Sequence, residues 1–87
     1  MQESYGIAAF RSRQQVLALE AALRREGLNV RVISTPRNIA LGCGLSVYFA
    51  LDNLEAVKRA VRIQKPHSMI GIYRVDRIDG RSRIAPV

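Results

Sequence analysis

The segment LNVRVISTPRNIALGCGLSVYFAL, residues 28–51, holds two strand patterns with a long connection between them. Residues 28–34 are rich in β-branched side chains and alternate in polarity, and residues 45–51 form another apolar run. A β-hairpin needs only about two to five connecting residues, whereas residues 35–44 separate these two strands. The segment therefore predicts a hairpin whose loop is longer than the turn requires, which indicates that the loop has a role besides reversing the chain.

A helix pattern lies on either side of this hairpin. In the first, Ser12 and Gln15 have the S-x-x-Q spacing of a capping box, and Gly27 stands where a left-handed residue ends a helix. In the second, Asp52 and Glu55 repeat the capping spacing. The apolar positions recur at helical spacing: Val16, Leu19 and Leu23 in the first pattern, and Leu54, Val57 and Val61 in the second.

Two further apolar runs, YGIAAF (5–10) and MIGIYRV (69–75), predict the first and last strands. The order is therefore βαββαβ, which matches the split βαβ motif of an α+β, ferredoxin-like fold: a four-stranded antiparallel sheet with both helices on one face. A chain of 87 residues has room for one core, so we expect residues 1–76 to form a single domain. Residues 77–87 form a basic tail or, because Asp79-Gly80 is a hairpin turn signal, an extra edge strand.

The net charge of +7 comes almost wholly from arginine. Arginine binds phosphate and carboxylate through paired hydrogen bonds, so the charge indicates an anionic partner or, more simply, a solvated basic surface. The sequence has no apolar stretch of about 18 residues and no signal-peptide pattern, so we expect no membrane association. The chain has one cysteine, and a free thiol suits a reducing cytoplasm.

The predicted topology brings three connections to one end of the sheet, and the 35–44 loop is one of them. Cys43 lies in that loop between Gly42 and Gly44, which leave its sulfur open to approach. A lone cysteine is often a small buried apolar residue, so a structural role is the alternative. The positively charged or titratable residues expected at this end are Arg11, Arg13, Arg37, Lys65 and His67.

These residue types suit thiol chemistry better than other kinds of site. A helical turn over residues 39–42, capped by Thr35 or Asn38, would favour a thiolate together with Arg37, and His67 would supply a proton. One cysteine and one histidine cannot close a metal site, so we expect no metal and no cofactor. A cysteine hydrolase needs an orienting third group and a substrate cleft, and the sequence indicates neither.

Nucleic-acid binding is the rival interpretation. A basic split βαβ sheet is the scaffold of the RRM, in which aromatic side chains of the central strands stack on bases. Tyr48 with Tyr5 or Tyr73 would fill that role here, but the RRM signature is absent. A basic module that binds RNA or an acidic protein, with a structural Cys43, therefore stays as the alternative function. A third is an assembly domain that forms a homodimer through its edge strands.

The loop and its flanks resemble a known family. Gly27, Val30, Val32 and Ile33, then Thr35-Pro36-Arg37, Ile39, Gly42-Cys43-Gly44 and Ile72-Tyr73 match the pattern of the small bacterial selenium/sulfur carrier-like proteins, long a domain of unknown function. The resemblance covers about residues 5 to 75, and its most specific part is the T-P-R…C-G combination. Two features depart from the pattern: residues 39–41 are IAL where more serine is expected, and a basic tail follows Tyr73.

The resemblance implies a carrier rather than a turnover enzyme. Cys43 would accept sulfur or selenium as a persulfide or selenosulfide from a donor such as a cysteine desulfurase and pass it to an acceptor protein. Arg37 and the Gly44 N–H would stabilise the transferred anion, while Thr35, Pro36, Gly42 and Gly44 would shape the loop. Arg11, Arg13 and Lys65 would bind an anionic partner surface.

Overall fold

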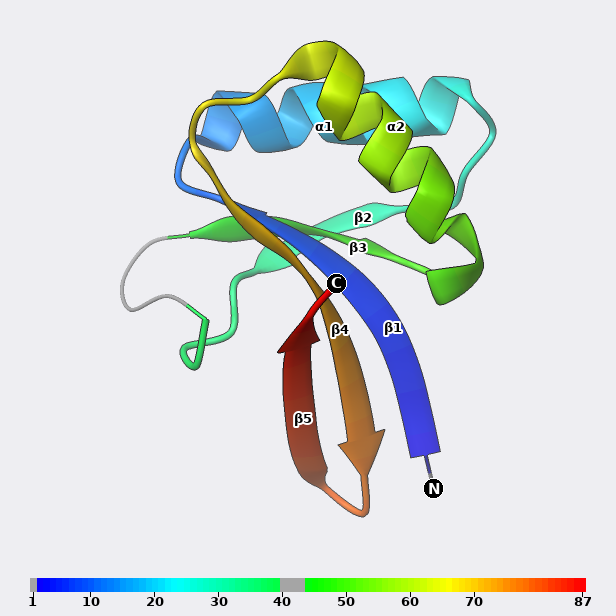
Figure 1. Ribbon diagram of the computed structural model, residues 1–87, viewed down its shortest axis with the longest axis vertical. Coiled ribbons are helices and arrows are strands. Elements are labelled where there is room, and N and C mark those ends of the chain that lie inside the picture. Colours follow the sequence, from blue (N-terminus) through cyan, green and yellow to red (C-terminus); the bar gives the residue numbers. More distant parts are fainter. Residues whose placement is uncertain (1, 40–43) are drawn as a thin grey trace.

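The computed structural model of the protein describes residues 2–39 and 44–87. Within these residues an α+β fold is present, in which five strands form one antiparallel sheet of order β2-β3-β1-β4-β5. Both helices lie on one side of that sheet (Figure 1). The elements are β1 (Gln2–Phe10), α1 (Arg13–Arg25), β2 (Arg31–Ser34), β3 (Leu45–Phe49), the 3₁₀ helix η1 (Leu51–Asn53), α2 (Leu54–Gln64), β4 (Met69–Ile78) and β5 (Arg81–Pro86).

Helix α1 begins and ends where its sequence signals predict. The Ser12 hydroxyl accepts a hydrogen bond from the N–H of Gln15 at 3.3 Å, which satisfies one of the free amides of the first turn. At the other end Gly27 takes φ 84°, and the N–H of Leu28 bonds the carbonyl of Leu23 at 3.1 Å. This is a Schellman ending, which glycine favours because it has no Cβ to clash in the left-handed region.

Two details of the predicted caps are wrong. The Gln15 side chain does not accept a hydrogen bond from the N–H of Ser12, because its carboxamide oxygen accepts one from the N–H of Ser68 instead. In the second helix Asp52 lies inside η1, and the residue that precedes α2, Asn53, makes no side-chain capping bond. Helix α2 ends at Lys65, a left-handed residue whose N–H bonds the carbonyl of Val61 at 2.8 Å. Neither helix in the described part of the chain is long and apolar enough to cross a membrane.

The core lies between the helices and one half of the sheet. Side chains alternate between the two faces of a strand, so the alternate residues of β1 and β3 face the helices while their neighbours face away. Burial of this apolar layer is the main force that holds the helices on the sheet. Its members are Ala8, Phe10, Val16, Leu19, Leu23, Val30, Val47, Phe49, Val57 and Ala60.

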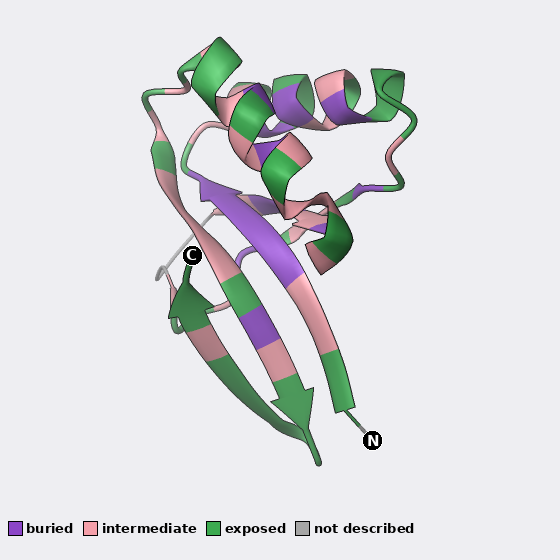
Figure 2. Cartoon of the chain, turned by 45° about the vertical axis from the view of Figure 1, so that its right-hand side comes forward, coloured by how far each residue is buried: buried purple, intermediate pink, exposed green. Residues whose placement is uncertain are grey.

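The sheet continues beyond the helices as a hairpin arm, formed by residues 2–5 of β1, residues 74–78 of β4 and the whole of β5 (Figure 1). Along β1 the residues change from exposed at Gln2 to fully buried from Gly6 onward (Figure 2). Asp79 and Gly80 have φ values of 50° and 79°, as expected for the predicted two-residue turn. Residues 81–86 therefore form the extra edge strand that was one of the two expectations for the C-terminus.

Candidate functional site

The loop that carries the T-P-R motif starts and ends at one end of the sheet. Phe10, the last residue of β1, pairs with Leu45 of β3 and with Met69 of β4. The N–H of Thr35 donates to the carbonyl of Gly44 at 3.0 Å and closes the base of the loop. Residues 40–43 lie outside the described part of the chain, so the predicted roles of Gly42 and Cys43 stay predictions.

A buried polar pair lies under this loop base. The hydroxyls of Thr35 and Ser46 are 2.7 Å apart, and Ser46 has no exposed surface while Thr35 is 8 % exposed. A Cβ added to Gly44 would lie 3.0 Å from the Thr35 hydroxyl oxygen, which is tighter than nine in ten real Cβ contacts, so the threonine would have to shift by a few tenths of an ångström. Thr35 and Gly44 are thus matched to each other, because glycine leaves room for the threonine side chain.

The next two residues of the motif form a tight turn. The carbonyl of Pro36 accepts a hydrogen bond from the N–H of Ile39 at 3.0 Å, and Arg37 lies exposed within this turn. The expected helical turn over residues 39–42 falls mostly outside the described residues, and the turn that is seen starts earlier in the chain. The Thr35 hydroxyl bonds Ser46 and so does not serve as the expected cap. A cap from Asn38 would bond the N–H of residue 40 or 41, both of which lie outside the described residues, so that expectation stays a prediction.

A hydrogen-bond network beside the loop base joins the start of α1 to the connection between α2 and β4. The carbonyl of Ser68 accepts from the N–H of Arg11 at 3.0 Å, and its hydroxyl accepts from the N–H of Ser12 at 3.0 Å. The Gln15 carboxamide oxygen accepts from both the N–H of Ser68, at 2.9 Å, and the Ser68 hydroxyl. Gln15 and Ser68 were not predicted as partners, because nothing in the sequence pairs residues 53 positions apart.

The predicted histidine is attached to the same network. The Gln15 amide nitrogen lies 3.3 Å from each ring nitrogen of His67, so it can donate to the one that carries no proton. His67 is exposed, as is Lys65 two residues earlier, and a hollow of about 390 Å³ opens between them and α1. The imidazole of His67 and the ammonium group of Lys65 are therefore both accessible to solvent at this hollow.

The structure thus brings several predicted residues to one end of the sheet. The Phe10 carbonyl lies 3.6 Å from where a Cβ of Gly44 would be, so the exit of the loop lies beside the start of the connection that holds Arg11. Through Ser68, that connection is bonded to the one that carries His67. The predicted approach of Arg37 or His67 to the thiol is not tested, because the thiol lies outside the described residues.

A sequence model of the family described as "Putative Se/S carrier protein-like" matches residues 5–73. The chain belongs to this family. The matched residues include the whole 35–44 loop, both helices and strands β2 and β3, which confirms the resemblance seen in the T-P-R…G-C-G motif. No curated protein and no solved structure matches the chain.

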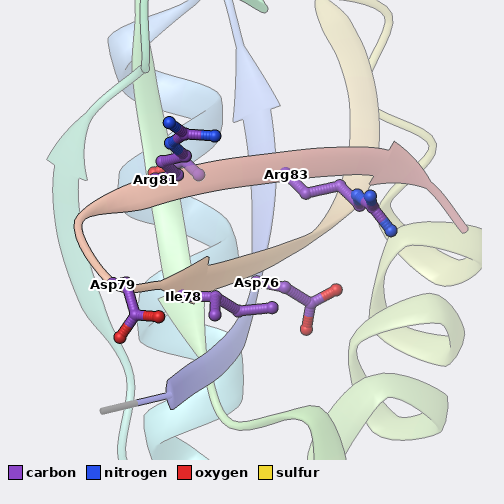
Figure 3. Close-up of a pocket in the computed structure, with 6 residues that line it drawn as sticks. Asp76, Ile78, Asp79, Arg81 and Arg83 are labelled. Atoms are coloured by element: carbon purple, nitrogen blue, oxygen red, sulfur yellow. The ribbon is translucent and has the colours of Figure 1, made fainter.

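This member of the Se/S carrier-like family has a further hollow, which sequence reasoning missed. It measures about 690 Å³ and lies on the hairpin arm, lined by Asp76, Ile78, Asp79, Arg81, Ser82 and Arg83 (Figure 3). A hydrogen bond from Ser4, and then one from Arg74, lower the pKa of the Asp76 carboxyl. All the lining residues lie after position 73, beyond the matched part, so this hollow is not part of what defines the family.

Proposed function

We propose that the protein is a carrier that holds sulfur or selenium on Cys43 and relays it between two partner proteins. The observation that carries the proposal is family membership over residues 5–73, which include the T-P-R…G-C-G loop. The anchored base of that loop supports it. Gly44, the residue joined to Cys43, is bonded to Thr35 and lies above the buried pair of Thr35 and Ser46.

The transfer step is a thiol exchange without net oxidation or reduction. The Cys43 thiol loses its proton, and the thiolate attacks the terminal sulfur of a persulfide on the donor. A new S–S bond forms on Cys43, and the donor cysteine leaves as a thiolate with the electron pair of the broken S–S bond. With a selenium donor the same displacement leaves a selenosulfide on Cys43. The onward step to the acceptor repeats the displacement at the terminal atom.

The charged groups around the loop have separate roles in this proposal. Arg37, exposed in the turn after Pro36, stabilises the anionic sulfur. His67, held by Gln15, returns a proton to the leaving thiolate. Arg11, Arg13 and Lys65 are all exposed, and they attract an acidic docking surface on a donor of the cysteine desulfurase type. A free carrier thiol also fits a reducing compartment such as the cytoplasm.

We further infer that the core of the protein has the ferredoxin-like βαββαβ arrangement. The order β4-β1-β3-β2 within the sheet, with antiparallel neighbours, supports this assignment. Both helices also lie on one side of the sheet (Figure 1). In this arrangement β5 is an addition at the β4 edge, and the carrier loop is the β2–β3 connection.

Loading by a donor tests the carrier proposal directly. The protein is incubated with a cysteine desulfurase and cysteine, and its intact mass is measured with and without reductant. We expect a gain of one sulfur atom that reductant removes and that Cys43→Ser abolishes. Because Cys43 is the only cysteine, this variant has no thiol left.

A relocated thiol is the matched control. Ser82→Cys in the Cys43→Ser background places one thiol on the exposed hairpin arm. If donors recognise the loop, the relocated thiol loads far less than Cys43. Equal loading of the two thiols, or no loading of the wild type while a known carrier loads, would overturn the proposal.

A further inference from the structure

The face of the sheet opposite the helices carries a row of aromatic and cationic side chains that the carrier proposal does not use. Val32, Val47 and Ile72 pack with the helices. Their strand neighbours, which include Arg31 and Tyr48, therefore face the other way. On β1 and β4 the same alternation places Tyr5, Tyr73 and Arg77 on this helix-free face. We define the row by four of these side chains, one from each of β2, β3, β1 and β4: Arg31, Tyr48, Tyr5 and Arg77.

The first three members of this row contact one another across the sheet, and Arg77 follows on β4, two residues along from Val75, the register partner of Tyr5. Arg31 pairs directly with Tyr48 in the strand register, and its guanidinium lies 4.3 Å from the centre of the Tyr48 ring. The Tyr48 ring lies 4.7 Å from the Tyr5 ring, with 33° between their planes. Tyr48 is level with Ile7 and Arg77 is level with Glu3, so the row crosses the four strands diagonally. With strands about 4.8 Å apart and residues about 3.3 Å apart, the row is about 20 Å long, and its two aromatic rings lie between two cationic ends.

The charge on this face is positive at both ends of the row and is partly offset by Glu3, which is the register partner of Arg77. Burial raises the pKa of Tyr5, while the positive charges of Arg77 and Arg31 act to lower it, which places both guanidiniums within electrostatic reach of its hydroxyl. Neither arginine forms an ion pair within the described residues. The acid nearby is Glu3, which accepts a hydrogen bond of 3.5 Å from the Tyr48 hydroxyl.

We propose that this row binds a single-stranded nucleic acid, with bases stacked on Tyr5 and on the Arg31–Tyr48 layer and phosphates bound by the guanidiniums. Bases stack on aromatic rings and on guanidinium planes alike, and such stacking tolerates any sequence. The two stacking positions suit about two nucleotides. A duplex fits poorly because its bases are already paired and stacked, and a second copy of the chain would bring arginines against arginines.

Tyr73 lies on the same face but outside the row. A Cβ added to Gly71 would lie 2.7 Å from the Tyr73 hydroxyl oxygen, so this ring lies back along its own strand over the glycine. It is therefore a matched control for the two stacking tyrosines: an aromatic residue of the same face, exposed to a similar degree, that the proposal leaves out.

Oligonucleotide binding by the full chain tests the proposal. Fluorescently labelled oligo-U and oligo-dT of roughly ten nucleotides, a length within the usual site sizes, are titrated with protein and followed by anisotropy. We expect both to bind, and more tightly than a duplex of the same length. For two phosphate contacts, log K should fall with log salt with a slope of about −1.4.

Three sets of variants locate the binding surface. Tyr5→Leu with Tyr48→Leu removes two stacking positions and should weaken binding at least about thirtyfold, whereas Tyr73→Leu should leave it nearly unchanged. Arg31→Gln with Arg77→Gln should weaken binding and flatten the salt slope. Arg25→Gln with Arg62→Gln, which removes the same charge from the exposed helix surface, should change it far less. Glu3→Gln removes the nearby negative charge and should tighten binding.

Several outcomes would overturn the proposal: no binding of either oligonucleotide, equal losses from the two arginine pairs, or equally effective competition by a poly-glutamate peptide. The relative affinities for oligo-U and oligo-dT show whether RNA or DNA is the natural ligand. If the double tyrosine variant fails to fold, the affinity of the Arg31→Gln, Arg77→Gln variant tests the proposal, because both arginines are exposed and their replacement should not disturb folding. Cys43→Ser should bind like the wild type, so this test and the sulfur-loading test fail independently.

Discussion

The hydroxyl pair beneath the carrier loop should behave as a coupled unit. Thr35→Val keeps the branched shape at the loop base but removes the hydroxyl that lies 2.7 Å from Ser46. Ser46 has no exposed surface, so water cannot replace the lost partner. An orphaned buried hydroxyl costs about 1–3 kcal/mol, whereas removing both partners together can be nearly neutral. We therefore expect Thr35→Val to lower the free energy of unfolding by about 2 kcal/mol.

A double-mutant cycle measures this coupling. Ser46→Ala alone should also be destabilising, because it leaves the Thr35 hydroxyl unpaired. The double variant should cost clearly less than the sum of the two single variants, by about 1–3 kcal/mol. Urea unfolding is the assay, and with a slope near 1 kcal/mol/M for a domain of this size the Thr35→Val midpoint should fall by about 2 M.

Two results would refute this reasoning. Single variants that each cost less than about 0.5 kcal/mol would mean that the pair is not sealed from water. A double variant whose cost equals the sum would mean that the two hydroxyls act independently. Thermal unfolding provides a second readout, because 1 kcal/mol shifts the midpoint of a chain this long by roughly 4–8 °C.

Three further predictions concern the ends of α1 and the hairpin arm. Gly27→Ala should lower the free energy of unfolding by about 1 kcal/mol in urea, because φ 84° strains an L-residue although no atom lies within 4 Å of the added Cβ; an unchanged midpoint would contradict this. Ser12→Ala should cost about 1 kcal/mol by removing the cap, and Ser12→Asp should restore most of it. The pKa of Asp76 is lowered by Ser4 and then by Arg74, so its contribution to stability is present near neutral pH and lost as pH falls below about 4 through the folded value. The urea midpoint of the wild type should therefore exceed that of Asp76→Asn at pH 7, and this gap should close in acid; a constant gap would contradict the prediction.

Signals local in the sequence predicted most of the fold. Apolar periodicity located both helices, and the Asp79-Gly80 dipeptide pointed to the turn before β5. The lengths of β1 and β4 were underestimated, because their outer residues belong to the hairpin arm, which no helix covers. Without a buried face the apolar pattern that marks a strand fades, and QES at residues 2–4 gave no such signal.

The candidate site was predictable only in part. The motif pointed to Thr35 and Gly44, but the reason for the glycine, room for the threonine hydroxyl, is a contact between residues nine positions apart in a folded loop base. Gln15 was predicted to complete its own helix cap and instead bonds Ser68, far along the chain. Such choices between a local and a distant partner depend on tertiary packing, which sequence spacing does not encode.

Strand β1 runs from an exposed end in the hairpin arm to a fully buried end beside the carrier loop. Amide hydrogens along this one strand should therefore exchange over a wide range of rates: quickly through fraying of the arm near Gln2, and slowly, only by opening of the whole core, near Phe10. The arm can then open and close on a fast timescale without loosening the loop base. Binding of a partner to the arm should therefore leave the geometry around Gly44 unchanged. The stability of the arm and that of the loop base are then independent of each other.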